Sequence, residues 1–176
     1  MHLNLSPKSA GEVTALRELF EHYLKCAYWT EEHLMPFYGR ISELIGSRDV
    51  LAAVEKHSGS TTLQYQRLQD IFKSIGLKPS SHRFEALAHH TQRLETVLAQ
   101  IPAGPVQDAA IIAELQQIIH CEIACYGTLR SFAIALKEER VVWLLEENLN
   151  DEKAFDTALS TIAQAYVNDE AANLEF

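Results

Sequence analysis

Three carboxylates and one imidazole interrupt the apolar faces of four long amphipathic stretches of this chain. Glu31, His57, Glu122 and Glu152 each lie near the middle of a different stretch, where the periodicity predicts a buried apolar side chain. Removing a carboxylate from water costs several kcal/mol unless a partner neutralises its charge. If these four side chains meet inside a helical bundle, they indicate either a metal site or a buried cluster that shares protons.

Apolar residues at intervals of three and four predict the helices that carry these side chains. Four long helices are expected, together with a shorter one between the second and third: about 12–45, 48–75, 82–100, 106–137 and 139–166. Ser9 and Glu12 have the spacing of an N-terminal capping box, Pro36 predicts a bend in the first helix, and Gly76 marks the end of the second. No segment sustains the alternation of a β-strand, so the sequence predicts an all-α protein.

The lengths of the connections predict how the helices are arranged. Short links make antiparallel hairpins of the first two long helices and of the last two. The connection between the hairpins spans about 30 residues, and its helix could reach roughly 27 Å, which is enough to run the length of a bundle. This is the ferritin-like four-helix topology, with a helical crossover between the second and third long helices. We expect the bundle to span residues 12–170, with an N-terminal extension over 1–11 and a C-terminal tail over 171–176.

Composition limits the class of protein. A chain of 176 residues with 47% hydrophobic and 22% charged residues fits one globular domain with a substantial core. Its formal net charge of -9 argues against nucleic acid or an anionic membrane as a partner. Without a signal peptide or a long apolar segment, we expect a cytoplasmic protein with reduced thiols at Cys26, Cys121 and Cys125.

Several short motifs resemble the YciE/YciF family of bacterial ferritin-like proteins. The most specific is the E-I-x-x-Y-G-T-L run at 122–129, and others are Leu19-Phe20 through Tyr28 to Glu31, D-E-K at 151–153 and V-N-D-E-A at 167–171. The resemblance covers nearly the whole chain after the first dozen residues. It implies a four-helix ferritin-like bundle that is associated with stress responses, pairs as a dimer and holds a two-metal carboxylate site.

The chain departs from the family pattern at ligand positions. Ser60 stands where the family's second helix has the Glu of H-x-x-E, and Ile119 stands where the third long helix has a Glu. Ferritin-like dinuclear centres use a Glu from each of two helices and a Glu-x-x-His pair from each of the other two. Here Glu122 is followed at that spacing by Cys125, and Glu152 by Phe155. The sequence therefore does not favour a dinuclear centre.

Two interpretations of the remaining polar residues stay open. One metal ion (iron, manganese or zinc) could be bound by Glu31, His57, Glu122 and Glu152, with Asp156 one turn along as an additional oxygen donor. Alternatively, the cluster is free of metal, and protonated glutamates hydrogen-bond to His57, Thr61 or Tyr126.

These interpretations lead to two functions, and neither favours an enzyme. The sequence slightly favours a bundle with a structural or interaction role, acting as a homodimer or with an unidentified protein partner. The alternative is a metal-binding protein that handles iron or manganese or consumes oxidant. The i,i+4 spacing of Cys121 and Cys125 could indicate a thiol site, but buried helical cysteines are usually ordinary small residues.

Overall fold

The computed structural model describes residues 15–173, and this part of the chain is helical without any strand, which confirms the all-α prediction. The predicted capping box of Ser9 and Glu12 lies outside the described residues. The elements are α1 (Leu16–Ser42), α2 (Arg48–Ser74), α3 (Glu85–Leu98), α4 (Pro105–Ala135), α5 (Glu139–Ile162), the π-helical turn η1 (Ala163–Val167) and α6 (Asn168–Ala172).

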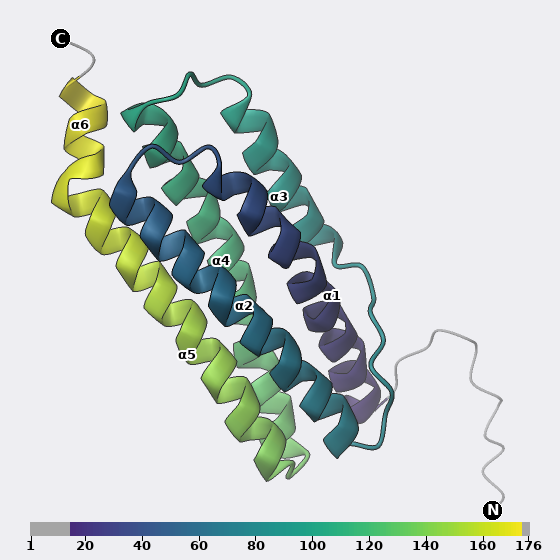
Figure 1. The fold of residues 1–176 in the computed structure, drawn as a ribbon. Helices are drawn as coiled ribbons and strands as arrows, with labels where there is room; N and C mark the ends of the chain where they lie inside the picture. The colour runs from purple at the N-terminus through teal and green to yellow at the C-terminus, as the bar shows by residue number, and fades with distance from the viewer. Residues whose placement is uncertain (1–14, 174–176) are drawn as a thin grey trace, which may run out of the picture.

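The four long helices form a bundle in which α1 packs on α2, α2 on α5, α5 on α4 and α4 on α1. Figure 1 shows that α1 and α2 make one antiparallel hairpin and that α4 and α5 make another. Between them the chain returns along the bundle through α3, so that α4 starts at the end of the molecule where α2 also starts. This order, two hairpins joined by one long crossover, is the predicted ferritin-like topology.

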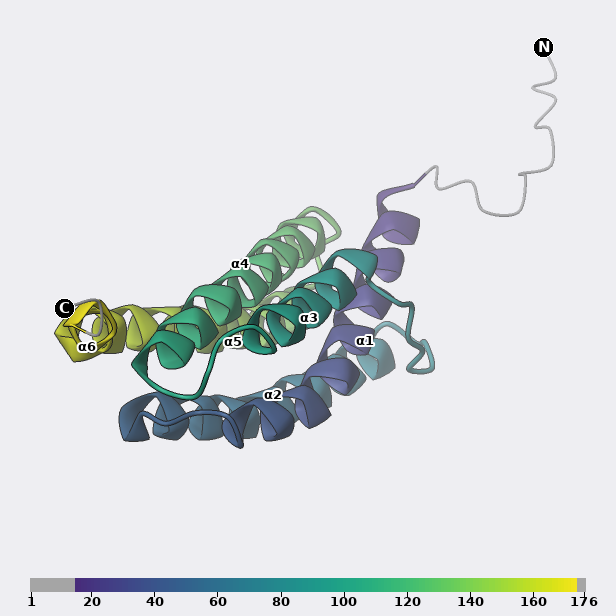
Figure 2. The ribbon, with the colours of Figure 1, turned by 90° about the horizontal axis from the view of Figure 1, so that it is seen from above.

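The crossover helix α3 lies outside the ring of four long helices and covers α1 and α4 (Figure 2). On the α1 side, His33 and Thr91 are joined by a hydrogen bond of 3.0 Å between Nε2 and Oγ1. On the α4 side, Arg93 pairs with Glu114 at 3.0 Å. The apolar face of α3, which includes Leu87 and Leu94, is buried in the core. The crossover is therefore a packed part of the fold.

Helix ends are fixed by local polar groups. Gly76 follows α2 with a φ of 75°, the left-handed conformation that glycine adopts without steric cost, as the sequence predicts for a helix stop. In the α1–α2 connection, the carboxylate of Asp108 accepts hydrogen bonds from the backbone N–H groups of Gly46 (2.9 Å) and Ser47 (2.8 Å). Ser47 in turn caps α2 by accepting a bond from the N–H of Val50. Asp108 thus ties the first hairpin to the start of α4.

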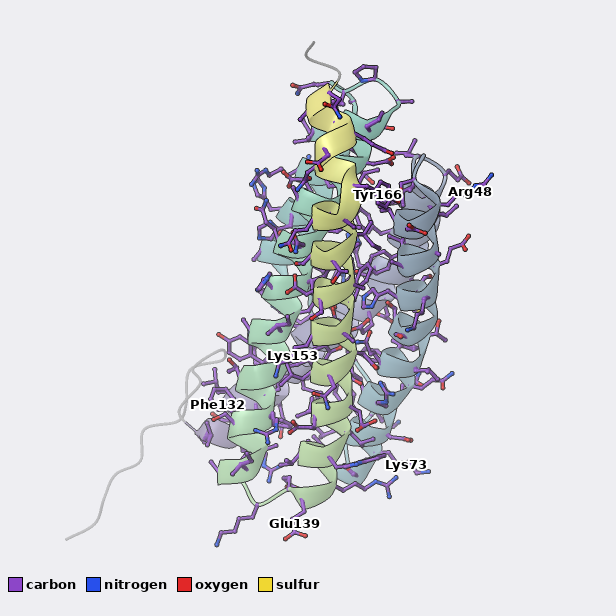
Figure 3. The ribbon with its side chains drawn as sticks, turned by 90° about the vertical axis from the view of Figure 1, so that its left-hand side faces the viewer. Arg48, Lys73, Phe132, Glu139, Lys153 and Tyr166 are labelled. Carbon is purple, nitrogen blue, oxygen red and sulfur yellow. The ribbon has the colours of Figure 1, made fainter. Side chains whose placement is uncertain are left out.

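The last predicted helix, 139–166, is not continuous. It changes after Ile162 into a π-helical turn, in which the N–H of Asn168 bonds to the carbonyl oxygen of Ala163. Beside this turn, the Tyr166 hydroxyl lies 2.6 Å from Oγ of Ser47 at the start of α2. Figure 3 shows Tyr166 near Arg48 at this end of the molecule. A side-chain hydrogen bond therefore joins the π-helical turn to the N-cap residue of α2.

The buried apolar side chains form two clusters, one toward each end of the bundle. One contains Leu34 and Phe37 of α1 together with residues of every other helix up to η1, and the other contains Phe20 and Leu24 of α1 with parts of α2, α4 and α5. Between them, each long helix contributes buried polar side chains, which we call the polar layer: Glu31, His57, Thr61, Gln64, Glu122, Asn148 and Glu152. The apolar core is therefore divided at mid-height by polar groups.

Within residues 15–173, no helix combines the length and the apolar character needed to cross a membrane.

Candidate metal centre

The four predicted residues enter the polar layer from four different helices: Glu31 from α1, His57 from α2, Glu122 from α4 and Glu152 from α5. On every helix the polar residue falls between the apolar stretches that supply the two core clusters. All four side chains are at least 97% buried. The bundle therefore positions them as the helical periodicity predicts.

Three of the four converge closely enough to share one ion. One nitrogen of His57 and one carboxylate oxygen each from Glu122 and Glu152 all lie within 4.8 Å of one another. Nε2 of His57 is 3.6 Å from Oε1 of Glu152. Two carboxylates and an imidazole at these distances are a donor set that suits iron, manganese or zinc.

Glu31 lies beside this group of three. Its Oε1 accepts a hydrogen bond from the hydroxyl of Tyr126, and its carboxyl interacts with that of Glu122. Its second oxygen, Oε2, is buried without a hydrogen-bond partner. Glu31 is therefore placed next to Glu122 with a free oxygen, as the fourth candidate donor.

A set of neutral and charged residues orients Glu152. Gln64 donates from Nε2 to Oε1 of Glu152 at 2.5 Å, and to the backbone oxygen of Asn148 at 3.4 Å. Arg67 then donates to Oδ1 of Asn148 (3.1 Å) and to Asp151 (2.6 Å) at the surface. Gln64 and Asn148 were not predicted as site residues from the sequence. Both lie on the buried faces of their helices, as the charged residues of the polar layer do.

Two aromatic rings hold the imidazole of His57. Phe155 stacks on it with ring centroids 3.9 Å apart and an angle of 13° between the planes, and Tyr38 meets it edge-on at 5.1 Å and 89°. Burial lowers the pKa of His57 to about 3, so the ring is neutral at pH 7. A neutral imidazole is the form that binds metal.

Burial has the opposite effect on the carboxyl groups. Desolvation raises the pKa of Glu31 to about 8, with the hydrogen bond from Tyr126 and the adjacent carboxyl group of Glu122 acting in the other direction. Desolvation, followed by the neighbouring charges of Glu152 and Glu31, raises the pKa of Glu122 well above its usual range. The pKa of Glu152 is likewise raised, first by desolvation and then by Glu31. Without a cation, burial favours the protonated form of these carboxyl groups more than it does for an exposed glutamate, and a cation among them would reverse this preference.

Polar atoms without hydrogen-bond partners are concentrated in the polar layer. Buried polar atoms are almost always paired in folded proteins, so such a concentration calls for a bound water or ion. Those in the polar layer are Oε2 of Glu31, Nε2 of His57, Oε1 of Gln64, both oxygens of Glu122, Nδ2 of Asn148 and Oε2 of Glu152. Four of these residues are ligand types, and their free atoms include carboxylate oxygens and an imidazole nitrogen. The residues present therefore fit a bound metal ion.

Asp156 is not brought into this group. Its side chain is 23% exposed and lies 3.3 Å from Nε2 of His120, and it accepts a hydrogen bond of 3.1 Å from Gln116. The physical reason is helical phase: the buried side of α5 continues from Glu152 through Phe155 to Leu159, so Asp156 is turned toward the surface of α4. Figure 3 shows α5 between α4 and α2, with the exposed Lys153 on its outer side.

The residues that replace the expected ligands pack in the core, stack on His57 or lie at the edge of the polar layer. Ile119 is buried in the apolar core, and Phe155 stacks on His57. Ser60 is partly exposed beside the polar layer. Cys125 is a free thiol whose pKa is raised mainly by burial, and next by the nearby Cys121. A half-buried thiol with a raised pKa is a poor nucleophile, which agrees with an ordinary packing role.

Comparison with known proteins places the chain in a family. Residues 15–172 match the family described as "Domain of unknown function (DUF892)". Protein YciF of Escherichia coli is 30% identical over 159 residues, which cover 90% of this chain and 96% of YciF.

Solved structures show the same fold. YcfI of Rhodopseudomonas palustris has a TM-score of 0.85 at 32% identity, covering 88% of this chain and 98% of that one. The E. coli stress protein YciF has a TM-score of 0.84 at 29% identity, covering 89% and 99%. A protein of Xanthomonas campestris pv. campestris, at 19% identity with a TM-score of 0.72 over 92% and 100%, shares the fold. This chain therefore belongs to the YciF family, DUF892.

Proposed function

We propose that this protein binds a single iron or manganese ion in the polar layer, through His57, Glu122 and Glu152, with Glu31 as a fourth donor. The observation that carries the proposal is the convergence of three ligand atoms from three helices within 4.8 Å. The buried oxygens that lack hydrogen-bond partners support it, because a cation would satisfy them.

One ion fits the available donors better than two. A ferritin-like dinuclear centre draws six ligands from its four helices. This chain offers four, since Ser60 and Ile119 occupy the two positions at which the family pattern has further carboxylates. Four protein donors suit one ion and leave coordination positions for small molecules.

The residues of the polar layer would fix the position of such an ion, balance its charge and exclude most of the water around it. A bound iron or manganese ion would supply one-electron redox chemistry in a largely closed site. Gln64 and Tyr126 hold the carboxylates of Glu152 and Glu31 by hydrogen bonds, while Phe155 and Tyr38 enclose the imidazole of His57. The E. coli relative is named a stress protein, and handling a redox metal or consuming oxidant would suit a role in stress.

A second candidate is a scaffold that acts by association, as a homodimer or with another protein. The observation in its favour is that burial favours the neutral forms of all four groups, lowering the pKa of His57 to about 3 and raising the pKa of the three carboxyl groups, so the polar layer does not depend on an ion to balance its charge. Trp143, which is 61% exposed on α5, is the kind of side chain that association surfaces use. The relative YcfI is described as a candidate structural protein.

Two measurements distinguish the metal-binding function from the scaffold function. The first is elemental analysis of protein purified without chelators or an affinity metal, and the second is titration with Fe²⁺ or Mn²⁺ under anaerobic conditions. The metal proposal expects one ion per chain, lost in Glu122→Ala and Glu152→Ala and retained in the control Asp156→Ala. If wild-type protein binds no stoichiometric metal and Glu122→Gln is at least as stable as wild type, the scaffold function holds instead. Sedimentation of the same samples measures the association that the scaffold requires.

A further inference from the structure

Two histidines and a cysteine meet where the connection between α2 and α3 passes along α1. His22 and Cys26 lie four residues apart, so both side chains stand on one face of α1. His82 belongs to the connection, and its backbone N–H donates a hydrogen bond of 3.1 Å to the carbonyl oxygen of Lys25. Figure 1 shows the connection running beside α1 on its way to α3. The backbone therefore holds His82 next to the face that carries the other two residues.

The spacing of these side chains resembles that of donors around one metal ion. Nε2 of His22 is 3.9 Å from Sγ of Cys26, and the ring centroids of His22 and His82 are 4.9 Å apart. In a tetrahedral zinc site, bonds of about 2.0 Å to nitrogen and about 2.3 Å to sulfur place a nitrogen and a sulfur donor about 3.6 Å apart, and two imidazole centroids about 5 Å apart. Two of the three pairs thus already have nearly the separation that one ion requires.

His82 is the donor that has to turn when an ion binds. Among residues 15–173, only the donors of the polar layer all lie within 4.8 Å of one another, so the third pair, Cys26 and His82, is still too far apart. The ring of His82 is exposed, and no hydrogen bond or ion pair within the described part of the chain holds it. Rotation about the side-chain bonds of His82 brings the ring toward Cys26 while the backbone bond to Lys25 stays in place.

The types of donor select the metal. One thiolate and two imidazoles suit zinc, or Co²⁺ in its place, whereas the carboxylates of the polar layer suit iron or manganese. Burial raises the pKa of the Cys26 thiol, so the free protein keeps this thiol protonated and an ion has to displace the proton. Arg83, the neighbour of His82, is already paired with Glu85 at 3.0 Å.

We propose that His22, Cys26 and His82 bind one zinc ion, with a water molecule as the fourth ligand. The ion fastens the α2–α3 connection to α1 through side chains, in addition to the backbone hydrogen bond at Lys25. The site shares no residue with the polar layer, so it stands or falls independently of the proposed function.

The first test is a titration of the reduced, untagged protein with Co²⁺, read from the near-ultraviolet charge-transfer band of a thiolate–cobalt bond. The polar layer contains no sulfur, so an ion bound there does not produce this band. We expect the band in wild type, its loss in Cys26→Ser, and its retention in the matched controls Cys121→Ser and Cys125→Ser. Absence of the band from wild type, its survival in Cys26→Ser or its loss in either control would overturn the proposal.

The two histidines are tested with variants that leave the core intact, because both side chains are exposed. Loss of a residue that only orients a metal ligand typically costs about 10- to 100-fold in affinity, so His22→Ala and His82→Ala, which remove donors, should each weaken Co²⁺ binding about tenfold or more. His89→Ala, at an exposed histidine of α3, is the control and should bind as wild type does. Unchanged affinity in His82→Ala would leave two donors on a single helix and reject the site.

Discussion

The side-chain amide of Gln64 donates a hydrogen bond of 2.5 Å to Oε1 of Glu152, the same oxygen that lies 3.6 Å from Nε2 of His57. Both neighbours of this oxygen come from α2, so one helix fixes the position of a carboxylate on another. The other oxygen of Glu152, Oε2, has no hydrogen-bond partner and remains available to an ion.

Replacing this donor should weaken metal binding without removing a ligand. We expect Gln64→Leu to lower the affinity for Mn²⁺ by about 10- to 100-fold, as is typical when a residue that orients a metal ligand is lost. Competition against a fluorescent chelator measures the affinity. Gln116→Leu is the control, because Gln116 bonds to Asp156 and Ser160 outside the polar layer. Equal affinity in the two variants would contradict the orienting role of Gln64.

Metal binding should release protons and strengthen as the pH rises. The pKa of Glu31 is about 8, and those of Glu122 and Glu152 are also raised, so these groups carry protons that a bound cation must displace. Each displaced proton makes the affinity about tenfold stronger per pH unit, up to the pKa of the group that loses it. Calorimetric titrations at pH 6, 7 and 8, in buffers of different ionisation enthalpy, count the protons. An affinity that is constant across this range would show that the carboxyl groups are already ionised.

The metal-free protein should become less stable from pH 5 to pH 8. Glu31 has a pKa of about 8 in the fold against 4.5 in its ordinary state, so the native state binds the extra proton. Its contribution to stability is complete below pH 4.5 and is lost as the pH rises through 8, at no more than about 1.4 kcal/mol per pH unit for one proton. Glu122 and Glu152 act in the same direction.

His57 has the opposite sign. The pKa of His57 is about 3 in the folded protein and 6.5 in its ordinary state, so the unfolded state binds the proton more readily. The contribution of His57 to the stability of the fold is therefore complete above pH 6.5 and is lost as the pH falls toward 3. Urea denaturation at pH 5, 6, 7 and 8 measures the net effect. Glu122→Gln removes one titrating carboxyl and should reduce the loss of stability toward pH 8, and an unchanged pH dependence in this variant would count against a protonated Glu122.

Asp108 provides a test of the fold that is independent of the polar layer. Asp108→Ala removes both hydrogen bonds to the N–H groups of Gly46 and Ser47, and we expect a loss of about 2–4 kcal/mol in the free energy of unfolding. Asp108→Asn keeps one acceptor oxygen and should lose less. Because Asp108 lies at the end of the bundle, metal affinity should be unchanged in both variants. A drop in affinity would mean that the connection between the hairpins also adjusts the centre.

The sequence predicts the helices and the burial of Glu31, His57, Glu122 and Glu152, because each stands at a position fixed by spacing within its own helix. It does not place Asp156, since a rotation of about 100° per residue decides whether a side chain next to the seam faces inward or outward. Gln64 and Asn148 escaped prediction because a buried amide, unlike a buried carboxylate, is common enough to carry little signal. The approach of His82 to His22 depends on the path of the connection between α2 and α3, which spacing along one helix does not reveal.

The polar layer is shared equally between the two halves of the chain. The α1–α2 hairpin supplies Glu31 and His57, and the α4–α5 hairpin supplies Glu122 and Glu152. Neither half alone holds more than two of the donors, so the centre is completed only when the hairpins dock during folding. An ion held between them would have to be released before the halves could separate. The rate of unfolding would then be limited by how fast that ion dissociates, so the centre would slow unfolding in addition to binding the ion.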